Sequence, residues 1–248
     1  MSGGPDSLAL LLLAEGAFPG RVEAATVDHG LRPESASEAR FVAGLCRDRG
    51  IEHAILTCAV ADGNLQDRAR SARYAALDQW AKGRELAAIA TAHHADDQAE
   101  TVLMRLNRGS GLSGLSGIRA STTIPGSDTL LLRPLLGWRR EELAQIVAAA
   151  GVTPVRDPSN EDPRFDRVRM RSALRNAAWI DPAALARSAE HMAEAEAFVG
   201  ACVDREWAEN VRQEDGAIHY QSVASTLIRK RVAQRIVAAL GGVADLSQ

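Results

Sequence analysis

The chain has 248 residues, of which 46% are hydrophobic and 25% are charged, and its formal net charge is −3. This composition supplies enough apolar sequence for one α/β domain and a small second one, and it excludes an intrinsically disordered protein. The slight negative charge argues against indiscriminate coating of nucleic acid, although it leaves room for a local basic surface.

Cysteine spacing and hydropathy narrow the setting of the protein. Cys46, Cys58 and Cys202 are too widely spaced for a zinc or iron–sulfur motif, and they fit a reducing compartment. No apolar run reaches the roughly 20 residues that span a bilayer, and no signal peptide precedes the globular sequence. We therefore expect a cytoplasmic protein with no membrane partner.

The first 150 residues alternate between predicted helices and strands. In chain order, we predict a helix over 5–15, a strand over 22–28, a helix over 35–49, a strand over 52–58, a helix over 64–83, a strand over 86–91, a helix over 96–107, a loop over 108–128, a strand over 129–133 and a helix over 139–150. This alternation predicts an α/β fold, an open parallel sheet with helices on both faces.

The composition changes after Pro158. Residues 159–175 are rich in arginine, after which we predict one long helix or two over 182–213, a strand over 217–220 and an amphipathic helix over 225–240. We place a domain boundary near residue 180. The predicted units are an α/β domain over 1–180 and a small, mostly helical C-terminal region over 181–248.

A glycine loop opens the chain, where residues 2–7 read Ser-Gly-Gly-Pro-Asp-Ser. Adjacent glycines let a backbone approach a phosphate closely, and the helix that follows offers its partly positive N-terminus. An ordinary turn before a helix is an equally good interpretation of so short a string. A phosphate loop of this kind should follow a central strand, for which the chain supplies only Met1. We therefore expect either a longer natural N-terminus or a truncated start.

A second polar motif, Asp-His-Gly-Leu-Arg over residues 28–32, follows a predicted strand. The carboxyl ends of strands in an open parallel sheet form the edge that binds ligands. His29 and Arg32 are therefore candidates for contact with phosphate, adenine or a target base. Standing alone, the motif would fit a surface loop equally well.

The third motif, residues 91–101, follows the apolar strand over 86–91 and contains two adjacent histidines and two adjacent aspartates. An enzyme that uses ATP needs Mg²⁺, which is held by one or two carboxylates together with phosphate oxygens. Asp96 or Asp97 is the metal candidate. The glycines that follow, from Arg108 onward, suit either a loop that closes over a ligand or a plain linker.

Six stretches in sequence order resemble the tRNA(Ile)-lysidine synthase family of PP-loop (N-type) ATP pyrophosphatases. They are SGGPDS, VDHGLRPES, NLQDRARSARY, ATAHHADDQAETVLMRLNRGSGLSGL, LLRPLL and DPSNEDPRFDRVRMR, between residues 2 and 171. The resemblance implies two steps. ATP adenylates C2 of the wobble cytidine in a tRNA(Ile) with a CAU anticodon, and free L-lysine then displaces AMP to give lysidine. ATP and Mg²⁺ are the implied cofactors.

The resemblance also implies roles for individual residues. Those matching the ATP site are Ser2, Gly3, Gly4, Asp6, Ser7 and Arg32; those matching catalytic positions are His29, His94, Asp97 and Arg108; those matching metal ligands are Asp96 and Asp97; and those matching substrate or tRNA positions are Glu100, Arg133, Arg164, Arg169 and Arg171. His94 is a candidate base for the lysine amine, although it would equally suit a hydrogen bond to phosphate.

Residues 133–175 hold nine arginines against six acidic residues, a local charge of +3 in a chain of −3. Arginines contact RNA phosphates and stack on bases, so this segment is the candidate tRNA surface, with a solvated helix face as the alternative. The basic tail over 225–240 suits tRNA contact, a homodimer interface or simple packing.

Two other functions remain open from the sequence. One is another PP-loop enzyme, such as a tRNA thiolase, against which the lack of paired cysteines weighs. The other is an ATP-binding module without catalysis, which would bind ATP but release no AMP.

Overall fold

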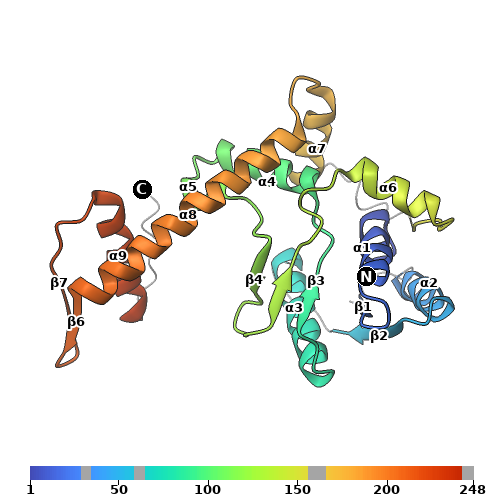
Figure 1. The fold of residues 1–248 in the computed structure, drawn as a ribbon, viewed down its shortest axis with the longest axis horizontal. Helices are drawn as coiled ribbons and strands as arrows, with labels where there is room; N and C mark the ends of the chain where they lie inside the picture. The colour runs from blue at the N-terminus through green and yellow to red at the C-terminus, as the bar shows by residue number, and fades with distance from the viewer. Residues whose placement is uncertain (29–34, 59–64, 156–165, 242–248) are drawn as a thin grey trace.

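The computed structural model describes residues 1–28, 35–58, 65–155 and 166–241 (Figure 1). Its elements are α1 (Pro5–Ala17), β1 (Glu23–Asp28), α2 (Ser35–Asp48), β2 (Glu52–Thr57), α3 (Leu65–Gly83), β3 (Ala88–Ala90), α4 (Ala95–Asn107), α5 (Leu112–Leu115), β4 (Ser121–Thr123), β5 (Leu130–Leu132), α6 (Arg140–Ala149), α7 (Asp166–Asn176), α8 (Pro182–Asn210), β6 (Val211–Glu214), β7 (Ala217–Tyr220) and α9 (Thr226–Ala239).

The strands of the first 150 residues form two parallel pairs. β1 pairs with β2 in parallel, and β3 pairs with β5 in parallel. β4 adds an antiparallel edge to β5. Within the described residues no strand hydrogen bonds join the two pairs. The amino group of Met1 donates to the carbonyl of Ala25 in β1, so the glycine loop starts beside that strand.

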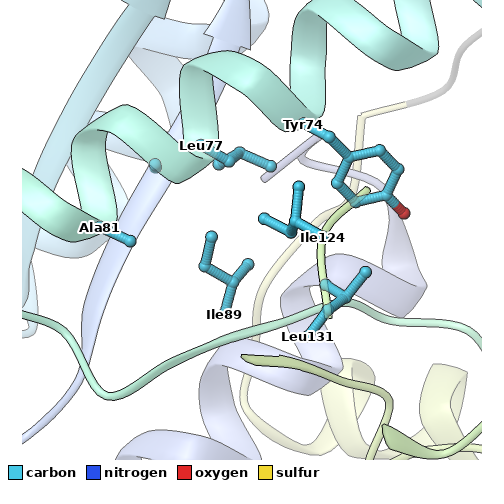
Figure 2. Close-up of a cluster of buried hydrophobic side chains, with 7 residues drawn as sticks. Tyr74, Leu77, Ala81, Ile89, Ile124 and Leu131 are labelled. Atoms are coloured by element: carbon cyan, nitrogen blue, oxygen red, sulfur yellow. The ribbon is translucent and has the colours of Figure 1, made fainter. Parts of the chain in front are cut away.

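Helices cover both faces of these strands. On one face, α3 packs Tyr74, Leu77 and Ala81 against Ile89 of β3 and Leu131 of β5 (Figure 2). Ala25 of β1 belongs to the same buried cluster, so the two strand pairs share one core.

On the other face, the apolar side chains of α1, α2 and α6 form two further clusters. Ala24 of β1 lies in the cluster beside α2, whereas its neighbour Ala25 faces α3, because successive strand residues point to opposite faces. The predicted α/β fold, parallel pairing with helices on both faces, is confirmed.

Two predicted ranges were wrong in detail. The loop predicted over 108–128 contains the short helix α5 and the edge strand β4. The helix predicted over 182–213 ends at Asn210, and β6 follows it directly. β6 and β7 form a hairpin across Asp215 and Gly216, both of which have positive φ. An Asp-Gly pair between strands is typical of such turns.

α8 is a single helix of 29 residues that links the α/β part of the chain to the hairpin and α9 (Figure 1). It packs against α4 and α5, where Ser116 Oγ donates to the Met192 carbonyl at 3.1 Å. At the middle of α8, one turn beyond Met192, Arg231 of α9 pairs with Glu196 at 3.0 Å. None of the helices in the described ranges is at once long and apolar enough to cross a membrane.

Candidate active site

The glycine loop, residues 2–7, adopts a conformation that requires glycine at its second position. Gly3 has a φ of +72°, in the left-handed region that side chains disfavour. Its carbonyl accepts a hydrogen bond from the Val155 N–H at 2.9 Å. A Cβ atom here would lie 3.1 Å from Val155 Cγ2, so a larger residue would push the two segments apart.

Two serine hydroxyls and the start of α1 face each other across this loop. Ser2 Oγ lies 3.1 Å from Ser7 Oγ, and Ser7 Oγ donates to the Gly4 carbonyl at 3.0 Å. Gly4 is the N-cap of α1, and no described side chain caps that helix. The first N–H groups of an uncapped helix attract anions. The loop therefore presents hydroxyl and amide donors of the kind that a phosphate needs.

His94 joins the glycine loop to α4. The residue is fully buried and is the N-cap of α4, where Nδ1 accepts from the Asp97 N–H at 3.4 Å. Nε2 lies 3.5 Å from Asp6 Oδ2 and 3.4 Å from Asp97 Oδ2. Because Nδ1 acts as an acceptor, the arrangement fits a proton on Nε2 that is donated to Asp6. The glycine loop and the 91–101 motif therefore meet in one site.

Both ring nitrogens of His94 are engaged in this arrangement. The Arg140 guanidinium approaches Nε2 to 3.3 Å, so positive charge also surrounds that nitrogen. To act as a general base, His94 would need an unoccupied lone pair that points at the amine of the substrate lysine. The geometry therefore favours a positioning role for His94, in which it orients Asp6, over the predicted role as a base.

Asp6 has one oxygen in use and one without a partner. Burial opposes its ionisation, yet the hydrogen bond from His94 and the charges of Arg140 and Arg171 lower the pKa of Asp6 below its usual value. Its Oδ1 is buried and has no hydrogen-bond partner among the described residues. An ionised carboxylate with a free, buried oxygen is suited to a cation or to a donor on a ligand.

Asp96 is engaged in structural contacts. Its Oδ2 accepts from the Arg140 backbone N–H at 2.8 Å, and its two oxygens lie 3.3 Å from Nε and Nη2 of Arg139. Burial opposes ionisation here as well, but the Arg140 N–H and the Arg139 guanidinium lower the pKa of Asp96. Asp96 therefore anchors α4 to the start of α6, and its arginine partner disfavours a second cation.

The carboxylates of this site suit Mg²⁺ better than they suit a metal ion whose ligands all come from the protein. No group of three or more His, Cys, Asp or Glu side chains suited to a metal lies within the described ranges. Mg²⁺ in nucleotide sites takes only one or two carboxylates, with phosphate and water oxygens for the rest. Asp6 belongs to the glycine loop, and Asp97 lies in the first turn of α4. Both contact His94 Nε2, so together they match that requirement. Of the two predicted ligands, the geometry favours Asp97 over Asp96.

Glu100 forms a buried ion pair with Arg171. The Arg171 guanidinium donates to Glu100 Oε1 at 2.7 Å and to Oε2 at 3.4 Å, and the Glu100 side chain is only 2% exposed. This pair ties α7 to α4, together with a hydrogen bond from Arg167 to Thr101 Oγ1 at 3.3 Å. Two predicted substrate residues are thus brought together, as partners of each other.

The other described arginines of the predicted RNA surface are mostly exposed. Arg169 pairs with Asp166. Arg108, which was predicted as a catalytic residue, is also exposed and lies 3.3 Å from Asp166, so its catalytic role stays a prediction. His29, Arg32 and Arg164 lie outside the described residues, so their predicted roles stay predictions.

Arg133 is buried at the end of β5, where Nη1 donates to the Arg119 carbonyl at 2.7 Å. It acts electrostatically on His93, whose Nδ1 lies 3.1 Å from Thr91 Oγ1. Burial lowers the pKa of His93 to about 4, an effect that Asp97 opposes and that the charges of Arg133, Arg167 and Arg70 reinforce. Arg133 therefore lies near the 91–101 motif, and its role as a substrate residue stays a prediction.

Sequence reasoning missed Arg139 and Arg140, which hold Asp96 and approach His94. Their only sequence signal is an adjacent pair of arginines that follows the LLRPLL stretch after two intervening residues, at the start of a predicted helix. That pattern alone does not distinguish a site residue from a solvated helix start.

Comparison with known proteins shows the family to which the chain belongs. Residues 1–178 match the PP-loop domain family. The chain is 49% identical to the tRNA(Ile)-lysidine synthase of Novosphingobium aromaticivorans over 245 residues, which cover 98% of this chain and 75% of that one. It is 48% identical to the tRNA(Ile)-lysidine synthase of Zymomonas mobilis over 224 residues, covering 88% of this chain and 68% of that one. The chain belongs to the tRNA(Ile)-lysidine synthase family.

A member of the tRNA(Ile)-lysidine synthase family is an ATP-using ligase that forms a carbon–nitrogen bond, and the resemblance seen in the sequence is thereby confirmed. Among solved structures, the fold resembles the U34-tRNA thiolase NcsA from Methanococcus maripaludis, with a TM-score of 0.64 and 16% identity. The match covers 78% of this chain and 71% of the thiolase. At that identity the likeness shows the PP-loop fold alone.

Proposed function

We propose that the chain converts the wobble cytidine of a tRNA(Ile) with a CAU anticodon to lysidine. In the first step, the C2 carbonyl oxygen of the cytidine attacks the α-phosphorus of ATP and pyrophosphate leaves. In the second, the amine of free L-lysine attacks C2, loses a proton and displaces AMP, so that a C–N bond replaces the C–O bond. The relatives named above and the PP-loop domain support this reaction.

One observation carries the proposal at the level of this chain. The glycine loop and the 91–101 motif, far apart in sequence, converge where His94 Nε2 lies 3.5 Å from Asp6. Adenylation is mainly positioning together with neutralisation of phosphate charge. The donors of Ser2, Gly4 and Ser7 supply the first requirement, and the nearby arginines contribute to the second.

Magnesium is the metal that this arrangement suits. Asp6, through its unpartnered Oδ1, and Asp97 are the residues that would hold Mg²⁺, which when bound lowers the negative charge of the triphosphate. The chain's own contribution is to keep both carboxylates in place through His94. Arg140 helps to keep Asp6 ionised through its charge.

Substrate recognition is assigned to the arginine-rich side of the site. Arg108, Arg169 and Arg167 are exposed on or beside α7 and suit the tRNA backbone. Glu100 is buried and already paired with Arg171, so its part in this proposal is to hold Arg171 and α7 against α4. The proposal also includes L-lysine as the second substrate and a CAU anticodon in the tRNA. It further includes a cytoplasmic location and a homodimer.

The test is an incubation of the protein with ATP, Mg²⁺, lysine and a tRNA(Ile) transcript, followed by AMP measurement and mass analysis of the wobble nucleoside. We expect AMP release that needs both tRNA and lysine, and a nucleoside heavier than cytidine by lysine less one water. Asp97→Ala should abolish both signals. Arg187→Ala, an exposed change on α8, should leave both signals unchanged.

Equal AMP release in the absence of tRNA and lysine would refute the assignment. A nucleoside that gains sulfur instead would identify a thiolase, and ATP binding with no AMP release would identify the module without catalysis.

A further inference from the structure

A cavity of about 460 Å³ opens between α3 and the β4–β5 edge of the sheet, beside the candidate active site. Its walls include Arg70 and Tyr74 of α3, Thr122 of β4, Ile124, and Arg133 at the end of β5. None of its lining residues comes from the glycine loop, so it is separate from the proposed phosphate site of ATP.

Two residues that line this cavity each carry a buried polar group with no partner among the described residues. These groups are the Tyr74 hydroxyl and the Arg133 Nε, in side chains of residues only 6% and 7% exposed. Figure 2 shows the Tyr74 hydroxyl turned away from the apolar side chains of Leu77 and Ile89. Buried donors without partners are rare in folded proteins, because burial without a hydrogen bond destabilises them. Both donors therefore indicate a ligand.

The charge around the cavity favours an anion. The Arg70 guanidinium lies 5.1 Å from the centre of the Tyr74 ring, at an exposed position. Arg70 and Arg133 both act on His93, which is next to the buried His94, so this positive region adjoins the site itself.

Asp78, the only carboxylate among the described residues that line the cavity, already has partners. Asp78 accepts a hydrogen bond from Ser127 Oγ at 2.6 Å and pairs with Lys82 at 3.2 Å. It also accepts from Thr129. These contacts leave no free negative group for an ammonium ion, which argues against lysine as the occupant.

We propose that this cavity binds a nucleotide adjacent to the target cytidine in the single-stranded anticodon loop. Its phosphate accepts hydrogen bonds from Arg133 Nε, the Tyr74 hydroxyl and Arg70, while Thr122 and Ile124 line the space for sugar and base. Arginine is the residue best suited to phosphate, and single-stranded RNA is recognised in such mixed polar and apolar pockets. The inference rests on the proposed function, because that function supplies the RNA.

The test measures binding of a fluorescently labelled CAU anticodon stem–loop by anisotropy, without ATP or lysine. We expect Arg70→Ala to weaken binding about tenfold and to reduce the salt slope by about one ion. Tyr74→Phe should weaken binding about fivefold, yet leave thermal stability in the absence of RNA unchanged or higher, because the hydroxyl it removes has no partner.

Arg73→Ala is the matched control. Its guanidinium lies 5.3 Å from the same Tyr74 ring, but it is not among the residues lining the cavity, so RNA affinity should stay within about twofold of wild type.

Unchanged RNA affinity in both Arg70→Ala and Tyr74→Phe would overturn the inference, and so would a raised KM for lysine with unchanged RNA affinity. The binding measurement does not depend on lysidine formation. A wild-type protein that binds the stem–loop but makes no lysidine therefore refutes the proposed function alone. If the wild-type protein makes lysidine and both variants bind the stem–loop with normal affinity, only the proposed role of the cavity is refuted.

Discussion

The imidazole of His94 caps α4 and contacts Asp6 at the same time, so its two contributions must be separated. Asparagine is a good N-cap but cannot reach as far as an imidazole. We predict that His94→Asn keeps most of the stability but raises the Mg²⁺ concentration needed for ATP binding about tenfold, because partners of metal-binding carboxylates typically contribute that much. Calorimetric ATP titrations at several Mg²⁺ concentrations, with urea unfolding alongside, measure both effects.

His94→Ala removes both contributions and serves as the comparison. It should lower the free energy of unfolding by about a further 1 kcal/mol through loss of the cap. If His94→Asn bound ATP with the magnesium dependence of the wild type, Asp6 would not need the imidazole.

His93 predicts a pH dependence of stability. Its pKa is lowered from 6.5 to about 4 in the folded protein, so between these values the unfolded chain binds more protons than the folded one. Stability must therefore fall as the pH falls from about 6.5 towards 4, by at most about 1.4 kcal/mol per pH unit for this residue. We predict that His93→Gln flattens the decline between about pH 6.5 and 5, where carboxylates scarcely titrate.

The measurement is urea unfolding at a series of pH values. His219→Gln, at an exposed position of β7, should leave the slope of stability against pH unchanged. A residual slope in His93→Gln is expected from His53, whose pKa burial also lowers. Identical slopes in wild type and His93→Gln would contradict the prediction.

Individual contacts differ in how far the sequence could reveal them. Asp6 and His94 were both predicted for the site, because each belongs to a motif that resembles the tRNA(Ile)-lysidine synthase family. The partners Arg139 and Arg140 were not predicted, because their contacts with α4 depend on how α6 packs. Likewise, Glu100 and Arg171 were expected to bind substrate. Only the tertiary structure could show that they pair with each other, because 71 residues separate them in the sequence.

At the scale of elements, the turn after α5 is tightly constrained. Gly117 has a φ of +63°, and a Cβ there would lie 2.3 Å from Gln98 Oε1. Gln98 cannot easily move, because it is buried and donates to the Ile118 carbonyl at 2.9 Å. We predict that Gly117→Ala lowers the free energy of unfolding by about 3 kcal/mol. The causes are backbone strain and the loss of the hydrogen bond between Gln98 and Ile118.

Gly126→Ala isolates the backbone part of that cost. Gly126 also has a positive φ, +78°, but a Cβ there would meet nothing within 4 Å. Its change should cost about 1 kcal/mol in the same urea experiment. Equal losses for the two variants would show that the contact with Gln98 is unimportant.

The predicted elements succeeded where hydrophobic periodicity is strong and long. α4 is an example, because buried Ala99 and Val102 recur at helical spacing. α5 was missed because four residues containing a glycine carry no period, and β4 was missed because its three residues, Ser-Thr-Thr, are all exposed. Short elements of this kind form because their neighbours hold them in place.

At the scale of the molecule, α9 packs against α8 and buries a single residue, Val232. Val232 is fully buried in α9, whereas Val237 of the same helix is 37% exposed. We predict that Val232→Asp destabilises the region from 211 to 241 by at least about 3 kcal/mol, because it buries an unpaired charge, and that ATP binding survives. Val237→Asp should change stability by less than about 1 kcal/mol.

Limited proteolysis with mass analysis, combined with ATP titration, measures this effect. Cleavage confined to the end of the chain would support the predicted boundary near residue 180, which stays a prediction until then. Loss of ATP binding together with the C-terminal region would show instead that the molecule unfolds as one unit.

The continuous α8 also acts as a lever arm. Twenty-nine helical residues extend about 43 Å, and one end packs on α4 and α5 while the other carries the hairpin and α9. About 18 of these residues lie beyond Met192, where Ser116 is bonded to the helix, so a pivot of about 5° at that point would swing the far tip by roughly 2 Å. Spin labels on Asp204 and on α3 would therefore detect such a pivot of α8 as a change in the distance between the two labels.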